Sequence, residues 1–125
     1  MKRIINSKNA PAAIGPYSQA VEVNNTLYIS GQIPIDSATG KVVEGGIAEQ
    51  TEQVMRNIEA ILSEAGYTFS DVVKSTCLLS DMVNFKAMNE VYGSRYNVNP
   101  PARAAFAVKE LPLGVLVEIE TVAVK

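Results

Sequence analysis

The residue types available for chemistry are restricted, because the chain contains no histidine. Histidine is the usual proton-transfer group near neutral pH, so its absence excludes Ser-His-Asp and Cys-His catalysis and argues against a catalytic zinc site. Proton transfer must therefore come from carboxylates, tyrosines, bound water or the single cysteine, Cys77. We expect no metal site.

Two charged residues in the C-terminal quarter are candidates for substrate chemistry. Arg103 presents a guanidinium whose parallel donors match the two oxygens of a carboxylate. Glu118 lies in an apolar, strand-like segment, where partial burial would raise its pKa toward working pH. Each also has a purely structural interpretation. Arg103 fits an exposed arginine beside a turn, and Glu118 and Glu120 fit ordinary rim or ion-paired residues.

Four further residues are candidates for lining such a site. The ring of Tyr17, which follows Gly15-Pro16, would close a pocket and its hydroxyl would order substrate or water; loop packing is the alternative. Ser30 and Gly31 end a β-prone run, and Gly31 either exposes backbone N–H groups to a ligand or serves a bend. Asn89 either donates an amide hydrogen bond or is an ordinary polar helix position.

Length and composition predict one globular domain spanning residues 1–125. Hydrophobic residues make up 47% of the chain and charged residues 19%, which is typical of neither disordered nor membrane proteins. The net charge of −2 gives no general attraction to nucleic acid or to acidic membranes, so we expect neither partner. A single cysteine fits a reducing compartment, and the expected location is cytoplasmic.

The first half of the chain predicts a hairpin followed by a helix. Residues 20–23 and 27–30 are β-prone runs joined around Asn24-Asn25, and asparagine tolerates the left-handed turn conformation. From Ile47 to Ala65 apolar residues recur at spacings of three, four and seven, which predicts an amphipathic helix. Gly66 is expected to end it.

The second half alternates strand and helix. The valine-rich run Val72–Leu79 predicts a buried strand, in which Cys77 is expected to be inert core. Asp81 or Asn84 is expected to cap a second helix that runs to about Tyr96. Two final strands are expected at residues 103–108 and 115–124.

This order of elements predicts a mixed sheet with two helices on one face. Both faces of the last strand are apolar: Val115, Val117, Ile119 and Ala123 alternate with Leu116, Glu118, Glu120, Val122 and Val124. Two helices cover only one face of a sheet. The other face therefore needs a partner, and we expect the chain to form a homo-oligomer.

Five segments, in order along the chain, resemble the RidA, or YjgF-type, family of reactive-intermediate deaminases. They are APAAIGPYSQA (10–20), YISGQIP (28–34), MNEVYG (88–93), PPARAAFAV (100–108) and VEIETVAV (117–124). The resemblance covers essentially the whole chain. It implies a chorismate-mutase-like α/β fold with a mixed six-stranded sheet, assembled as a homotrimer with its sites between subunits.

The resemblance also implies a reaction, in which 2-aminoacrylate-type enamines and their imine tautomers are hydrolysed to a 2-oxo acid and ammonia without a cofactor. It assigns Arg103 to the substrate carboxylate, Glu118 to proton transfer through water, and Tyr17 to the active site. In the family, Ser30, Gly31 and Asn89 line the cleft.

The chain departs from many of these relatives at Ala105, where they carry a cysteine two residues after the arginine. A mechanism that needs a thiol there cannot apply, whereas a contribution from the Ala105 backbone carbonyl would be preserved.

Two other functions stay open: a non-catalytic trimer that binds small 2-oxo acids, and an RNA-directed translation inhibitor. The acidic balance and the lack of histidine count against the second.

Overall fold

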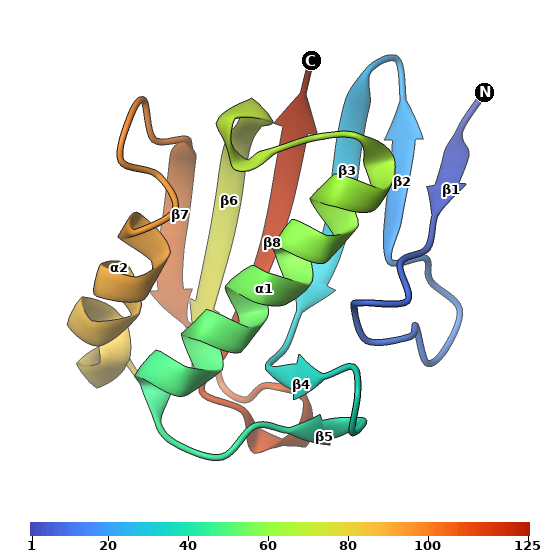
Figure 1. Ribbon diagram of the computed structural model, residues 1–125. Helices are drawn as coiled ribbons and strands as arrows, with labels where there is room; N and C mark the ends of the chain where they lie inside the picture. The colour runs from blue at the N-terminus through green and yellow to red at the C-terminus, as the bar shows by residue number, and fades with distance from the viewer.

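The computed structural model describes residues 1–125 and is built on a six-stranded mixed sheet in the order β1-β2-β3-β8-β6-β7. The strands are β1 (Arg3–Ile5), β2 (Ala20–Val23), β3 (Thr26–Gln32), β6 (Val72–Leu79), β7 (Ala102–Ala107) and β8 (Val117–Val124). Neighbouring strands are antiparallel except for the parallel pair β6–β7 at one edge. A separate two-stranded ribbon, β4 (Ile35–Asp36) with β5 (Lys41–Val42), lies beyond the end of β3 (Figure 1).

The segments with a clear apolar periodicity form the predicted helices and strands, whereas the sequence did not predict the shortest strands. The sixth strand of the sheet is β1, which pairs antiparallel with β2. Three residues are too few to produce a recognisable alternation, so local pattern did not identify β1, β4 or β5. The last strand begins at Val117, two residues later than expected.

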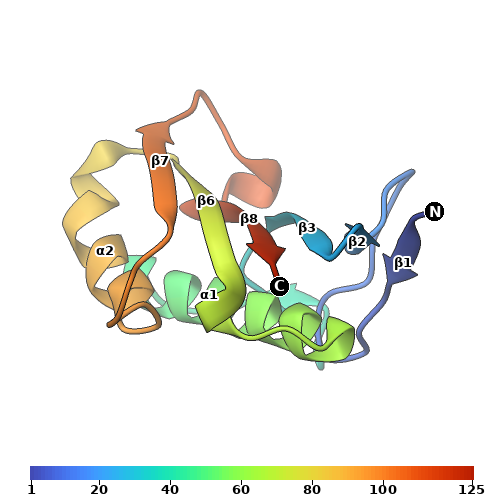
Figure 2. The same ribbon diagram turned by 90° about the horizontal axis from the view of Figure 1, so that it is seen from above.

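Two helices lie on the same side of the sheet (Figures 1 and 2). Helix α1 (Ile47–Ala65) has the predicted bounds and ends at Gly66, whose φ of 83° is the left-handed conformation that favours glycine. Helix α2 (Phe85–Gly93) is shorter than expected, because the chain turns after Gly93 instead of continuing to Tyr96. Asp81 accepts a hydrogen bond from the Val83 backbone N–H and caps the 3₁₀ turn that leads into α2.

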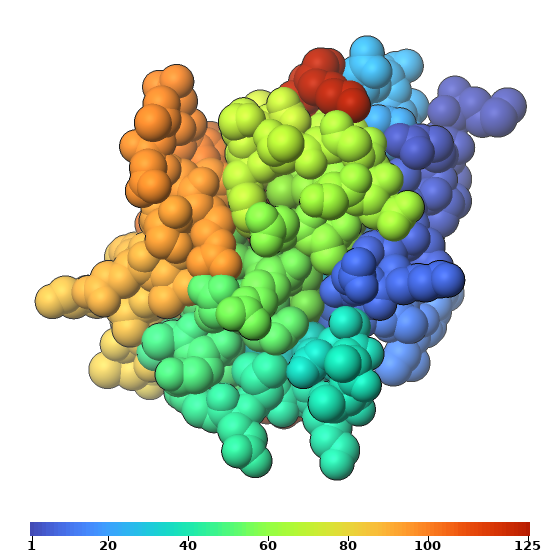
Figure 3. All heavy atoms as spheres, in the orientation of Figure 1, coloured from blue at the N-terminus to red at the C-terminus, as the bar shows by residue number.

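The core lies between the helices and the sheet. Fully buried residues of α1 include Val54, Met55, Ile58 and Ile61, and they belong to one cluster with Leu27, Leu79 and Ile119 of the sheet. Burying each such side chain contributes about 1.5–3 kcal/mol. Viewed from this side, the space-filling surface consists mainly of the helices, the N-terminal segment and the segment that follows α2 (Figure 3). Neither helix has the length and apolar character needed to cross a bilayer.

The opposite face of the sheet carries no helix. In β8 the residues Val117, Ile119, Thr121 and Ala123 are buried, while Glu118, Glu120, Val122 and Val124 point to the other side. Three large side chains are roughly half-exposed on this open face: Tyr28, Phe106 and Val124. The architecture of a six-stranded mixed sheet with two helices on one face is therefore confirmed, and the uncovered face carries partly exposed apolar side chains together with Glu118 and Glu120.

Candidate active site

The predicted site residues lie around two separate clefts of similar size. The first, the Glu118 cleft, has a volume of ≈ 570 Å³ and is lined by Ile14, Tyr17, Ser30, Gly31, Ile33, Pro112, Leu113, Glu118 and Glu120. The second, the Arg103 cleft, has a volume of ≈ 510 Å³ and is lined by Asn89, Tyr92, Gly93, Tyr96, Pro100, Pro101 and Arg103. Both are large enough for a small carboxylic acid.

The Glu118 cleft begins at an irregularity in β3. The pairing of β3 with β8 runs regularly to Ile29 opposite Thr121 and resumes at Gln32 opposite Ile119, so Ser30 and Gly31 form a bulge. A Cβ atom added to Gly31 would lie 2.1 Å from Oε2 of Glu118. The glutamate carboxylate therefore rests directly on the glycine backbone, and only a residue without a side chain leaves it that space.

The environment of Glu118 favours its protonated form. Burial raises the pKa of this carboxyl above its ordinary value, and the negative charge of Glu120 raises it further. The Glu118 carboxylate accepts no hydrogen bond and forms no ion pair within the chain. The carboxyl is therefore not committed to a structural contact and is free to exchange a proton with a ligand or a water molecule in the cleft.

Loop residues 17–19 are held against the end of β3 by two hydrogen bonds of Ser30. The Ser30 backbone N–H donates to the Gln19 carbonyl at 2.9 Å, and its hydroxyl donates to the Ser18 carbonyl at 2.6 Å. The Gln19 side chain is buried and joins this loop to Ser7 and Pro11. These contacts place Tyr17 at the cleft with its side chain half-exposed. In this arrangement Ser30 positions the loop, and its hydroxyl oxygen retains accepting capacity toward a ligand.

The Arg103 cleft is organised around a guanidinium that is already oriented. Nη1 of Arg103 donates to Oδ1 of Asn89 at 2.6 Å. The guanidinium carbon lies 5.1 Å from the ring centre of Tyr92 and 5.4 Å from that of Phe85, which are favourable cation–π distances. One donor is used and the others remain, so a carboxylate can still bind in the bidentate manner. The amide nitrogen of Asn89 also remains free to donate.

Within one chain the two clefts are on opposite sides of the sheet. Arg103 is in register with Ser75, and Ser75 with the buried Thr121, so this row faces the helices. Glu118 is in register with Leu78, and Leu78 with the exposed Phe106, so that row faces the open side. One small ligand cannot contact Arg103 and Glu118 of the same chain. The structure brings together Tyr17, Ser30, Gly31 and Glu118, and separately Asn89 and Arg103.

Ala105 and Cys77 lie next to each other in register, on the helix side with Arg103. Ala105 packs against the core, and Cys77 is fully buried. The expectation that Cys77 belongs to the core is confirmed. Burial raises the pKa of its thiol to about 11, which disfavours the reactive thiolate at neutral pH. No three acidic or cysteine side chains gather closely enough to bind a metal ion.

Sequence analysis missed several residues that line the clefts. Ile14, Ile33 and Leu113 line the Glu118 cleft, and nothing in the local pattern distinguished them from ordinary loop or core residues. Leu113 carried no usable signal, because its left-handed φ of 58° is visible only in the backbone. Tyr92 is a buried core residue of α2, and its ring also lies beneath Arg103.

Comparisons with known proteins agree with these motifs over the whole chain. The chain is 49% identical to the human 2-iminobutanoate/2-iminopropanoate deaminase, covering all of this chain and 91% of that protein. A Rid-family protein from Yersinia pestis has a TM-score of 0.97 and 46% identity, with complete coverage of both chains. Escherichia coli TdcF, solved with bound serine, has a TM-score of 0.93 and 35% identity over 98% of each chain.

A protein-family model described as Endoribonuclease L-PSP matches residues 7–125. The match includes all the residues that line the two clefts. The chain therefore belongs to this family, which is the family of the RidA and YjgF-type proteins that the sequence motifs indicated.

Proposed function

We propose that this protein is a deaminase that hydrolyses 2-imino acids and their enamine tautomers to 2-oxo acids and ammonia. The substrates are 2-aminoacrylate, 2-iminopropanoate and 2-iminobutanoate. Full-length identity of 49% to a protein named 2-iminobutanoate/2-iminopropanoate deaminase supports this assignment. The observation in the structure that carries it is the pair of Arg103, oriented for a carboxylate, and Glu118, whose pKa is raised.

Hydrolysis of an imine requires one water molecule and two proton transfers. The water oxygen bonds to the C=N carbon and one of its protons passes to the nitrogen, which gives a carbinolamine. The hydroxyl proton of the carbinolamine then passes to the amino group, the C–N bond breaks, and ammonia leaves the carbonyl of the 2-oxo acid. Only water and protons move, so the reaction needs no cofactor and no metal.

Each proposed catalytic residue has one role in this sequence. Arg103, with Asn89 beside it, binds the substrate carboxylate and fixes the position of the reacting carbon. Glu118 transfers protons between the water and the nitrogen, directly or through a second water, and protonates the terminal carbon of an enamine. Tyr17 and the backbone at Gly31 border the reacting group, and Ala105 lies two residues from Arg103 on the same face of β7.

The site in this proposal is shared between two copies of the chain. Arg103 comes from one copy and Glu118 from its neighbour, because the two side chains lie on opposite faces of one sheet. The open face, with Tyr28, Phe106 and Val124 partly exposed, is the surface proposed to contact the neighbour. We propose a homotrimer with a site at each subunit boundary. The proposed location is the cytoplasm, whose reducing conditions suit a lone buried thiol.

The test generates 2-aminoacrylate in the cuvette with a serine or threonine dehydratase and follows the imine by semicarbazide trapping. Wild-type protein should accelerate loss of the imine. Arg103→Ala should reduce kcat/KM on the order of 100-fold, since each charge-assisted hydrogen bond contributes about 1.5–3 kcal/mol. Arg103→Lys is the matched control, because it keeps the charge and loses the parallel donors. If the wild-type protein does not accelerate the loss of any imine tested, the proposed deaminase activity is excluded.

Two other functions can be distinguished with the same variants. A protein that binds 2-oxo acids in the shared site without accelerating imine hydrolysis would be a ligand-binding trimer. The family description names an endoribonuclease. Cleavage of RNA would require attraction to a polyanion, which a net charge of −2 does not provide, and an acid–base pair within one cleft. RNA degradation that survives Arg103→Ala and Glu118→Gln would argue for an unrelated activity.

A further inference from the structure

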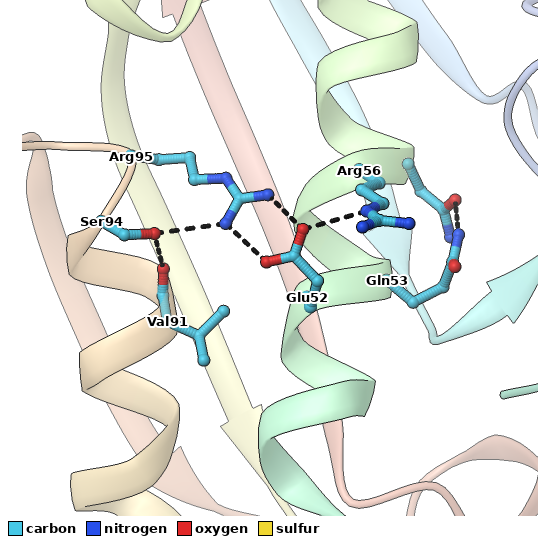
Figure 4. A network of polar contacts seen from close by, with 7 residues as sticks. Glu52, Gln53, Arg56, Val91, Ser94 and Arg95 are labelled. Atoms are coloured by element: carbon cyan, nitrogen blue, oxygen red, sulfur yellow. Dashed lines mark hydrogen bonds and ion pairs between the residues drawn. The ribbon is translucent and has the colours of Figure 1, made fainter. Parts of the chain in front are cut away.

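A charged network joins the two helices on the side of the molecule that carries the Arg103 cleft (Figure 4). Arg95, which follows α2, donates from Nη1 to Oε1 of Glu52 at 2.7 Å and from Nη2 to Oε2 at 2.6 Å. Glu52 lies in α1, so this bidentate pair ties the end of α2 to α1. Nε of Arg56, one turn further along α1, donates to the same carboxylate at 3.0 Å.

The Glu52–Arg95 pair differs from the other ion pairs in its burial. The Arg95 side chain is 19% exposed, whereas those of Arg56 and Arg3 are 66% and 55% exposed. The Arg95 hydrogen bond lowers the pKa of the Glu52 carboxyl to about 2. Glu52 is therefore ionised at every working pH, and the pair persists across that range.

Helix α2 depends on such a tie because it has few other anchors. It is nine residues long, and only Met88 and Tyr92 are buried. An isolated helix shorter than about 12 residues is marginal in water, so tertiary contacts must fix it. At its C-terminal end the Ser94 hydroxyl donates to the Val91 carbonyl and accepts from Arg95, which extends the network into the last turn.

The same short helix holds the residues that orient Arg103. Asn89 accepts the hydrogen bond from the guanidinium, and the rings of Phe85 and Tyr92 lie beneath it. The strand that carries Arg103 is the edge strand β7, which pairs only with β6. The placement of α2 relative to α1 therefore determines the direction in which the guanidinium points.

We propose that Glu52 and Arg95 are positioning residues for substrate binding. Neither lines the Arg103 cleft, and both act through α2 on Asn89 and on the rings that support Arg103. Their loss weakens binding of the substrate carboxylate and leaves the proton-transfer step intact, because Glu118 lies on the opposite face of the sheet. The inference rests on the proposed function, in that it takes Arg103 to bind a carboxylate.

The experiment measures binding of 2-oxobutanoate, the stable product of the proposed reaction on 2-iminobutanoate, by titration calorimetry. For Glu52→Gln, which keeps the side-chain volume, we expect Kd to rise about fivefold, with a matching rise in KM and with kcat within about twofold of wild type. Arg56→Gln removes the exposed partner of the same carboxylate and is the matched control. It should leave both Kd and KM at their wild-type values.

Exchanging the charges provides the second variant. Glu52→Arg combined with Arg95→Glu, in the Arg56→Gln background so that two arginines do not face each other on α1, should restore Kd to within about twofold of wild type. Wild-type-like Kd in a folded Glu52→Gln protein overturns the positioning role while leaving the proposed function intact. Failure of the wild-type protein itself to bind 2-oxobutanoate overturns both. If circular dichroism shows that Glu52→Gln does not fold, the charge-exchange variant is the test of the positioning role. Binding of 2-oxobutanoate restored in that variant supports the role. Weak binding by a folded charge-exchange variant overturns it.

Discussion

The two clefts hold their charged groups in opposite ways. Arg103 has a hydrogen-bond partner, two aromatic rings beneath it and a helix fixed by an ion pair behind it. Glu118 has none of these, and it lies half-buried over a glycine with another carboxylate near by. The proposed binding group is oriented by several contacts, and the proposed proton-transfer group is left without partners, which would suit a group that must bind and release protons.

The guanidinium of Arg103 and the carboxyl of Glu118 need different surroundings for their proposed roles. A guanidinium keeps its charge in any environment and benefits from being oriented, whereas a carboxyl near neutral pH must have a raised pKa to carry a proton. The residues that orient Arg103 come from α2 and face the helices, and those around Glu118 come from the bulge in β3 and face the open side. Separation by the sheet keeps the cation from lowering the pKa of the carboxyl within one chain.

Removing the carboxyl of Glu118 should have the largest effect. Glu118→Gln should reduce kcat on the order of 100-fold or more, the usual contribution of a general acid–base group, with Kd for 2-oxobutanoate little changed. The measurement is the semicarbazide-coupled assay together with calorimetry. A loss that appeared mainly in Kd would show that Glu118 binds substrate rather than moving protons.

The same substitution makes a prediction about stability. The folded state holds the Glu118 proton more tightly than the unfolded state, because its pKa is raised on folding. The ionised group therefore destabilises the native protein at neutral pH, and this cost disappears as pH falls through the folded pKa toward the ordinary value of 4.5. Glu118→Gln should raise Tm at pH 7 and leave it unchanged well below pH 4.5, which thermal melts at both pH values can check.

Mixing two inactive variants tests whether the clefts act together. The two variant chains, Arg103→Ala and Glu118→Gln, are co-expressed so that mixed oligomers form. A site shared between two copies is then intact when the Glu118→Gln chain supplies Arg103 and the Arg103→Ala chain supplies Glu118. About a quarter of wild-type activity should then return, whereas a site within one chain should recover none. Each variant expressed alone provides the baseline. Absence of any recovery in demonstrably mixed oligomers would contradict the shared site.

The smallest expected effect is a displacement of Glu118 without its removal. In Gly31→Ala the new methyl group would lie 2.1 Å from the carboxylate oxygen, so the flexible end of Glu118 must move. We expect a loss of about tenfold in kcat, since a misplacement of about 1 Å costs up to about 100-fold. Gly46→Ala is the control, because its added Cβ would lie no closer than 3.9 Å to another side chain and Gly46 lines neither cleft. Equal kcat in both variants would show that the close contact between Gly31 and the Glu118 carboxylate does not matter for activity.

The elements with strong periodicity were predictable from sequence. The spacing of apolar residues in α1 and the glycine after it determined both ends of the helix, because each end depends on local conformation. The end of α2 was wrong by three residues, since the buried Tyr96 continues the apolar spacing although the backbone has already turned at Gly93. Strand β1 has no local signal and is defined by its pairing with β2.

The sequence by itself limited the chemistry that the chain can perform. Without histidine, proton transfer is left to carboxylates, tyrosines, bound water or one cysteine, and the family resemblance singled out Arg103 and Glu118 as the candidates. Its alternation also predicted an open apolar face, because side chains of one strand take alternate sides whatever its neighbours are.

Only the tertiary structure decided where those groups stand relative to each other. Alternation fixes faces within a strand, but the relation between β7 and β8 depends on pairing through β6, which links residues far apart in the chain. That pairing places Arg103 and Glu118 on opposite sides of the sheet. The bulge at Ser30 and Gly31 and the ion pair between Glu52 and Arg95 are likewise long-range contacts, and no local pattern contains them.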